Sequence, residues 1–363
     1  MKPACCSLMT LLVFLLQANQ ADTQPSSSRS GMRPGTGGWT QSHRIQVGLE
    51  RDSNIFETRQ FPRPDMALRI TINSNIRRNG RKIKLHGGYS GAVLVYAENG
   101  VENKWTHVLQ LQASWLLRPE LLLQGTLQGY FKFFWDNPVD FGQTVSDLRA
   151  RIRLPGRWGV LIGWSTSRLD YRQSTWFDFT GRHGYLTFMR ALRPSLAFEF
   201  TLRQSRLNFF RPAYELTPEK FIRSPGTLQR DHQTDVVLRL RHRSAWLTQI
   251  VLDWQKNRSN SYGYSFRRWR LQLIMGWPVT RRWFFRLASL FQIKRYEERI
   301  PPLLPLDLDV ERTESNFIIA DLLYALNRRS TLLVRISGYN NESILRGVYY
   351  RKVLLFSGVE FHF

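Results

Sequence analysis

Cysteine is almost absent from this chain of 363 residues, because the only two, Cys5 and Cys6, lie side by side near its N-terminus. Beyond them there is no thiol that could form a disulfide or a thiolate metal site. The rest of the chain must therefore be held together by hydrogen bonds, ion pairs and apolar packing.

Long apolar runs are also missing beyond the N-terminus. No later stretch reaches the roughly 18 consecutive apolar residues that a membrane-spanning helix needs, which excludes a helical membrane protein. A disordered chain is excluded as well, because 42% of the residues are hydrophobic and 13% are aromatic. Acidic residues are scarce, with 28 Asp and Glu against 52 Lys and Arg, and the formal charge of +24 points to anionic partners.

The first 21 residues have the composition of a secretory signal peptide. Lys2 supplies a positive charge, Leu8–Leu16 form a short apolar run, and Ala18 and Ala21 are small residues suited to cleavage. A buried N-terminal helix is the alternative, but a stretch rich in Pro, Ser and Gly follows. We expect residues 1–21 to be a signal peptide, 22–42 a disordered periplasmic leader, and 43–363 one folded domain.

Apolar and polar residues alternate along most of the chain from His43 onward, which is typical of strands with one apolar and one polar face. One such apolar face is formed by Leu121, Leu123, Leu127, Phe131 and Phe133. About sixteen segments of about ten residues repeat the pattern, and this is the length at which a tilted strand crosses a bilayer.

The connections between these segments alternate between short and long. Short ones carry turn residues, as in Pro155-Gly156-Arg157, and long ones lie between them, as in 52–65 and 208–230. The chain is therefore predicted to be all-β, a transmembrane up-and-down antiparallel β-barrel of about 16 strands, with tight turns on the periplasmic side. A soluble sandwich or propeller is the alternative, but neither explains the regular alternation of connections.

The C-terminal strand carries apolar residues at Val359, Phe361 and Phe363, and it resembles the assembly signal of bacterial outer-membrane barrels. Three further segments, 47–56, 312–316 and 339–343, resemble porin-type barrels linked with exopolysaccharide secretion. The resemblance implies the outer membrane of a Gram-negative bacterium. It also implies three partners, which are the barrel-assembly machinery, outer-membrane lipid and lipopolysaccharide.

Cations recur on the polar faces of several segments, and arginine facing lipid would cost about 2–4 kcal/mol at the bilayer midplane. We therefore expect these cations to face the lumen and bind anions: Lys82, Lys84, Arg149, Arg151, Arg153, Arg239, Arg241, Arg243, Arg268, Arg270, Arg282, Arg286 and Arg335. Such a lumen would pass an anionic solute or acidic polysaccharide.

Two alternatives to anion transport are open. The arginines can pair across the lumen with carboxylates (Asp147, Glu199, Asp235, Asp253 and Glu360) or bind lipopolysaccharide phosphates at the rim. The barrel can also be a non-conducting structural or assembly protein whose lumen is filled by bulky residues, namely Tyr130, Phe134, Phe284 and Tyr349. The long 208–230 segment can fold inward as a constriction or lie outside as a lid.

Enzymatic and nucleic-acid functions find little support in the sequence. His183, His232 and His242 lack a partner at a spacing that suggests catalysis, and no metal cluster or Gly-rich phosphate loop is present. Trp residues interleaved with Arg could stack on bases, but no nucleic-acid-binding motif accompanies them. We expect no catalytic residue, no metal, no cofactor and no nucleic-acid partner.

Overall fold

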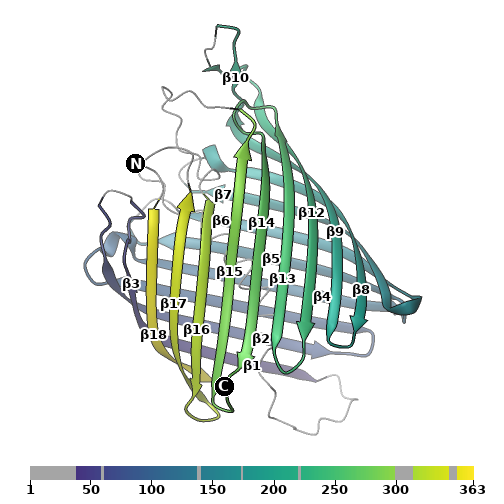
Figure 1. The fold of residues 1–363 in the computed structure, drawn as a ribbon, viewed down its shortest axis with the longest axis vertical. Coiled ribbons are helices and arrows are strands. Elements are labelled where there is room, and N and C mark those ends of the chain that lie inside the picture. Colours follow the sequence, from purple (N-terminus) through teal and green to yellow (C-terminus); the bar gives the residue numbers. More distant parts are fainter. Residues whose placement is uncertain are drawn as a thin grey trace.

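The computed structural model describes residues 38–58, 61–136, 140–172, 175–219, 222–298, 314–342 and 350–363. Sixteen of its strands form one closed barrel (Figure 1): β1 (Trp39–Asp52), β2 (Asp65–Asn79), β3 (Ile83–Tyr96), β4 (Lys104–Arg118), β5 (Leu121–Phe134), β6 (Phe141–Leu154), β7 (Trp158–Tyr171), β8 (Phe179–Arg193), β9 (Leu196–Pro212), β12 (Leu228–Arg243), β13 (Leu247–Ser259), β14 (Phe266–Pro278), β15 (Trp283–Tyr296), β16 (Glu314–Ala325), β17 (Ser330–Glu342) and β18 (Tyr350–His362). The described residues contain three single turns of 3₁₀ helix, which lie between strands: η1 (Gly100–Glu102), η2 (Pro155–Arg157) and η3 (Thr175–Phe177).

Within the described residues no helix has the length and apolar character required to cross a membrane.

Every barrel strand pairs antiparallel with its neighbours, and the first strand closes the barrel against the last. Val47 of β1 lies opposite Val359 of β18, and the backbone of His43 exchanges two hydrogen bonds with that of Phe363, of 2.9 and 3.1 Å. The predicted all-β, up-and-down antiparallel barrel of about 16 strands is confirmed.

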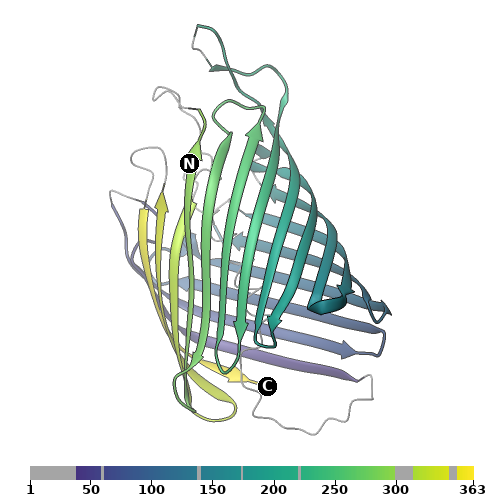
Figure 2. The ribbon, with the colours of Figure 1, turned by 45° about the vertical axis from the view of Figure 1, so that its right-hand side comes forward.

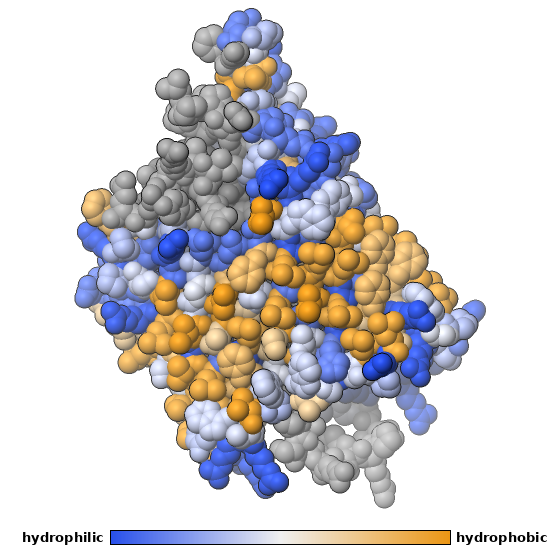
Figure 3. Space-filling view, viewed as in Figure 1, coloured by the Kyte–Doolittle hydropathy of each residue, from blue (hydrophilic) through white to orange (hydrophobic). Residues whose placement is uncertain are grey.

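The two faces of the barrel wall differ as the alternation predicts. On β5, for example, Leu127 and Phe133 are exposed on the outer face, whereas Lys132 and Phe134 point inward and are buried. Figure 3 shows an apolar belt across the visible outer face, bordered above and below by polar residues. The polar face of the strands therefore lines the lumen, and the apolar face forms the belt.

Short turns and long connections lie at opposite ends of the barrel, as predicted. The strands are longer than the expected ten residues, from 12 in β16 to 17 in β9. The paired strands continue beyond the apolar belt toward the long connections, as Figures 1 and 3 show in the same view. β1 begins at Trp39 and not at His43, because Thr40 to Ser42 already pair with β2. Residues 1–37, with the expected signal peptide and most of the expected leader, lie outside the described residues.

The long connection after β9 does not fold inward as a constriction. Its described residues form a separate hairpin, β10 (Glu215–Leu216) paired with β11 (Ile222–Arg223), and this hairpin projects away from the barrel (Figures 1 and 2). The ion pair between Arg223 and Glu215, 2.5 Å, lies across this hairpin. The inward alternative is therefore wrong for this segment, because the pairing of β10 with β11 extends the chain outward.

Apolar packing inside the barrel is confined to small clusters. One consists of Val108, Tyr130, Phe141 and Leu169 on neighbouring strands, and another of Leu323, Leu333 and Phe356 with Phe284 against them. Of the bulky residues expected in the lumen, Tyr130, Phe134 and Phe284 do face inward, and Tyr349 lies outside the described residues.

Candidate functional site

The lumen face carries most of the cations expected there. Eleven residues of the expected set lie on inward-facing positions of strands: Lys84, Arg149, Arg151, Arg153, Arg239, Arg241, Arg243, Arg268, Arg270, Arg286 and Arg335. Lys82 and Arg282 lie instead in the short turns before β3 and β15, so they belong to the short-turn rim of the barrel. At that rim the Nη1 of Arg282 donates a hydrogen bond to the Tyr324 hydroxyl, 3.3 Å.

Three carboxylates on the lumen face each bind two arginines. Asp321 pairs with Arg335 at 2.6 Å and with Arg286 at 2.9 Å, and it is nearly buried between them. Its neighbours lie directly opposite it on β17 and β15, so the three side chains form one row across three strands. Each such triad neutralises one arginine and leaves one positive charge in the lumen.

The other two triads are built on Asp253 and Glu199. Asp253 pairs with Arg270 and, at 3.7 Å, with Arg268. Glu199 pairs with Arg239 at 2.8 Å and with Arg241 at 3.8 Å.

Pairing along the lumen wall, within one strand or between neighbouring strands, extends to other carboxylates. Asp147 lies 3.7 Å from Arg149 and accepts a hydrogen bond from the Tyr185 hydroxyl at 2.5 Å. Glu360 pairs with Arg44 at 3.8 Å. Asp235 is buried and has no ion pair within the part of the chain that the structure describes. Much of the arginine set is therefore held in place by acids, as the pairing alternative expected.

Five lumen-facing cations differ from the paired ones. Their side chains are exposed and have neither an ion pair nor a hydrogen bond among the described residues: Lys84, Arg151, Arg153, Arg203 and Arg243. These groups place positive charge on the lumen face and have no salt-bridge partner in the part of the chain that the structure describes, although Arg203 lies opposite the buried Asp235.

A line of cross-strand partners that carries five cations crosses eleven of the sixteen barrel strands, from β3 to β15. Successive cross-strand partners lead from Lys84 through Ser114, Gln124, Arg149, Gly163, Tyr185, Arg203, Asp235, Gln255 and Arg268 to Lys294. We call its five cations, Lys84, Arg149, Arg203, Arg268 and Lys294, the cationic ladder. The first three intervals span three strands each, or about 14 Å.

The cationic ladder climbs from one end of the lumen to the other. Lys84 lies next to the short-turn end of β3, and Lys294 lies close to the long-connection end of β15. The line climbs because it runs perpendicular to strands that are tilted against the barrel axis by about 35–45°. The five cations therefore lie at successive heights of the lumen wall.

The sequence patterns missed several lumen cations. They are Arg44, Arg69, Arg77, Lys104, Lys132, Arg203, Arg211, Lys294 and Lys352. The lumen carboxylates are fewer: Glu50, Asp52, Asp65, Asp147, Glu199, Asp231, Asp235, Asp253, Asp321 and Glu360. The strand parity that identified Arg149 would also have identified Arg203, which alternates with Leu202.

Some of these missed cations support the structure of the wall. Arg211 is almost completely buried; its Nε donates to Gln229 at 2.8 Å and its guanidinium lies over the rings of Phe209 and Tyr264. Lys352 forms an ion pair with Asp52 at 2.7 Å where β18 closes on β1. Such groups are part of the packing and are not free to bind a solute.

The histidine candidates show no catalytic arrangement. His183 faces the lumen between two hydroxyls, with Nδ1 2.8 Å from Ser205 Oγ and Nε2 3.0 Å from Ser167 Oγ. No carboxylate of the described residues forms a hydrogen bond with it, so the orienting acid of a nucleophilic triad is missing. Among the described residues no three His, Cys, Asp or Glu side chains form a group that could hold a metal ion.

The outer face has the character of a surface in lipid. Large apolar side chains are exposed around the barrel, among them Leu111, Leu148, Ile293 and Ile336, with relative exposures of 60%, 64%, 63% and 55%. Water-soluble monomers rarely expose apolar patches of more than a few hundred Å². A closed barrel also satisfies its backbone hydrogen bonds internally, as a membrane requires.

No protein-family model matches the chain, and no curated protein is similar to it in sequence. Several solved structures share the barrel. A bacterial polysaccharide outer membrane secretin is 7% identical, with 88% of this chain and 98% of that chain covered and a TM-score of 0.44. OccAB3 of Acinetobacter baumannii is 8% identical (90% and 100% covered, TM-score 0.47), and an anion-selective porin from Comamonas acidovorans is 8% identical (90% and 99%, TM-score 0.44).

At these identities the likeness concerns the fold alone, and no lumen residue can be carried over from one chain to the other. The assignment to a membrane comes from this chain's own closed sixteen-stranded wall and its apolar belt. Barrels of this architecture are those of Gram-negative outer membranes. The chain is an outer-membrane β-barrel protein.

Proposed function

We propose that this barrel is a porin-like channel that passes anionic solutes or acidic polysaccharide. The observation that carries the proposal is the cationic ladder, which places five cations at successive heights of the lumen. A barrel of sixteen strands is wide enough to enclose an aqueous channel. Cations along such a channel concentrate anions and repel cations.

The chemistry of the ladder suits carboxylate, phosphate and sulfate groups. Arginine is permanently charged and can hold such a group through two parallel N–H donors. In the triads the Nε of Arg239, Arg268 and Arg286 is buried and has no acceptor among the described residues. Burial keeps these three Nε atoms out of reach of a solute. The exposed guanidinium groups of Arg151, Arg153, Arg203 and Arg243 are therefore the groups through which a passing anion would bind.

The triads contribute rigidity and charge together. Pairing to one carboxylate fixes two long side chains, so they lose less entropy when an anion arrives. Because each triad retains one net positive charge, the fixed arginines still attract anions. A polyanion would find repeated binding positions along the ladder, and this supports the polysaccharide form of the proposal.

Selectivity of the double variant Lys84→Gln/Arg203→Gln tests the proposal. Both residues belong to the ladder and neither has an ion pair among the described residues, so the change breaks no salt bridge. We expect a smaller chloride-to-potassium permeability ratio in planar bilayers than for the wild type. The matched control is Arg281→Gln/Arg328→Gln, which removes the same charge from exposed short turns and should leave the ratio nearly unchanged.

A non-conducting structural barrel is the second candidate. It is favoured by the buried residues on the lumen face, above all the cluster of Tyr130, Phe141, Val108 and Leu169. A correctly inserted barrel without conductance would support this candidate. A stable conductance would exclude it, whatever the ionic preference.

A further inference from the structure

The outer face of the barrel carries cations above the apolar belt, on the side of the long connections. Arg182, Arg206, His232 and Arg258 lie directly opposite one another on four adjacent strands, β8, β9, β12 and β13. All four are exposed and share the outward parity of the apolar belt, as Arg206 does with Leu202. We call these four residues the upper row.

A second row lies closer to the apolar belt than the upper row by one outward-facing residue, which is two positions along the strand. It consists of Lys256, Arg267 and Arg295, which are successive cross-strand partners on β13, β14 and β15. Arg267 has an exposed ion pair with Glu297 at 3.2 Å. The other six residues of the two rows have no ion pair within the described part of the chain.

Like charges directly opposite each other destabilise a sheet unless a counter-ion neutralises them. Arg182 opposite Arg206 is such a pair, whereas Arg267, opposite Arg295, already has Glu297 as its counter-ion. Their position also excludes contact with the lumen, because the inward positions between them are taken by buried residues such as Ser205 and Asn257. No described residue supplies a counter-ion for Arg182 and Arg206, so an anion bound to the outer face would stabilise this pair.

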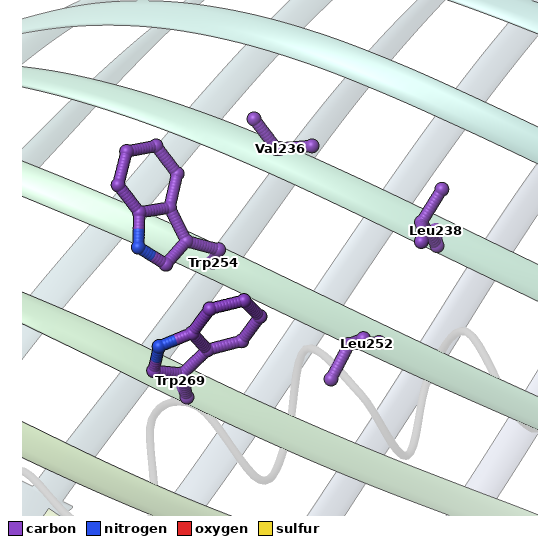
Figure 4. A pocket seen from close by; sticks show the side chains of 5 residues that line it. All are labelled: Val236, Leu238, Leu252, Trp254 and Trp269. Atoms are coloured by element: carbon purple, nitrogen blue, oxygen red, sulfur yellow. The ribbon is translucent and has the colours of Figure 1, made fainter.

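An apolar groove lies on the membrane side of the residues that the two rows contribute from β12, β13 and β14. Its volume is about 350 Å³, and its lining is Val236 and Leu238 of β12, Leu252 and Trp254 of β13, and Trp269 of β14 (Figure 4). Trp254 and Trp269 are cross-strand partners, one outward position below Lys256 and Arg267. The apolar groove and the cations therefore adjoin on the same three strands.

We propose that this face binds a phosphorylated acyl lipid of the lipopolysaccharide type, with phosphates on the two rows and an acyl chain in the groove. The cations supply the charge complementarity, since a phosphate accepts two N–H donors from one arginine. The groove supplies an apolar slot at the depth where acyl chains begin. Figure 3 displays this order on the visible face, with polar surface above the apolar belt.

The order of the two features favours a lipid over a soluble polyanion. A soluble polyanion needs only cations, and it gains nothing from Trp254 and Trp269. A lipid without phosphates needs only the groove, and it leaves Arg206 and Arg258 unneutralised. Only an amphiphile with an anionic head above its acyl chains uses both features in the order in which they occur.

Native mass spectrometry of the folded barrel in detergent tests the proposal, with lipid A and dephosphorylated lipid A as probes. We expect the wild type to retain lipid A about ten-fold better than the dephosphorylated form. Arg206→Gln/Arg258→Gln and, separately, Lys256→Gln/Arg295→Gln should lose most of that difference. Arg281→Gln/Arg328→Gln, with the same loss of charge at the opposite end, should keep it.

The groove has its own pair of variants. Leu238→Trp fills it and should lower retention of lipid A several-fold, whereas Leu240→Trp, the next outward residue of β12, lies outside the groove and should not. Folding of each variant is checked by its heat-modifiable gel mobility. Equal retention of the two lipids by the wild type, or full retention by both double variants of the rows, would overturn the proposal.

Discussion

Arg335 and Asp321 lie directly opposite each other on β17 and β16 and share two parallel hydrogen bonds on the lumen face. The Nε of Arg335 donates to Oδ1 at 2.6 Å, and its Nη2 donates to Oδ2 at 3.0 Å. Arg286 approaches the same carboxylate from the other side at 2.9 Å. The carboxylate is thus the shared counter-ion of two arginines.

Removing that counter-ion should destabilise the barrel strongly. Asp321→Asn keeps the shape of the side chain but leaves two partly buried guanidinium groups without a negative charge. Breaking a buried ion pair in this way costs about 3–5 kcal/mol. We expect a loss of that order in the free energy of unfolding, measured by urea titration of the refolded barrel.

The control for this prediction is Asp170→Asn. Asp170 pairs with Arg168 at 2.7 Å, but both side chains are exposed on the outer face. Water and salt screen such a pair, so its loss should change stability very little. If the two variants unfolded at the same urea concentration, the triad would have no special structural role.

Gly163 of β7 is required by the ring of Tyr185 on the neighbouring strand. A Cβ at this position would lie 2.2 Å from Cζ of Tyr185, whose hydroxyl donates to Asp147 at 2.5 Å. Gly163→Ala should displace the ring and break that hydrogen bond, at a cost of about 1–3 kcal/mol. The difference is measurable as a lower apparent melting temperature.

Gly125→Ala is the matched control for Gly163→Ala. Gly125 also lies within a strand, and a Cβ there meets no atom within 4 Å. Alanine costs less backbone entropy than glycine, so this variant should be as stable as the wild type or slightly more stable. A greater loss of stability for Gly125→Ala than for Gly163→Ala would show that the ring contact is unimportant.

Glu102, in the η1 turn between β3 and β4, predicts a pH effect at the long-connection end. Burial raises the pKa of its carboxyl above 4.5, against the opposing influence of Lys104 and Lys132. A carboxyl with a raised pKa binds its proton more tightly when folded. Protonated Glu102 therefore contributes fully to the stability of the folded chain at pH values below its pKa in the unfolded chain. This contribution is lost as the pH rises through its pKa in the folded chain.

Glu102→Gln removes this titration and keeps the size of the side chain. Relative to the wild type, the variant should gain stability at about pH 8 and differ little at about pH 3, below the unfolded pKa of glutamate. Apparent melting temperatures at the two values measure the effect. Glu98→Gln, at an exposed position of the same connection, is the control, and an equal gain there would contradict the burial argument.

Much of the fold could be predicted from the sequence because membrane strands have a local signature. The alternation of Leu121, Leu123 and Leu127 with polar residues assigns each to the outer face, and the structure places them there. The prediction of strand ends was less accurate. Lys132 of β5 and Phe141 of β6 are cross-strand partners in a part of the sheet that extends past the apolar belt. The outer face of the sheet no longer contacts lipid there, so the alternation of apolar and polar residues no longer marks the strand.

The cationic ladder could not be predicted, since it depends on the register between strands. Lys84 and Lys294 are 210 positions apart, and only the cross-strand pairings place them on one line. The upper row and the second row of the outer face could not be predicted either, for a related reason. Arg206 shares the parity of Leu202, and its height above the apolar belt follows from the tilt and length of β9.

The ionic preference of the wild-type barrel tests the central claim most directly. The chain from residue 22 onward is refolded and inserted into planar bilayers, and the reversal potential is measured across a KCl gradient. A stable conductance with chloride more permeant than potassium is the predicted result. A cation-selective conductance, or a folded and inserted barrel with no conductance, would contradict the claim that the lumen is an anion channel.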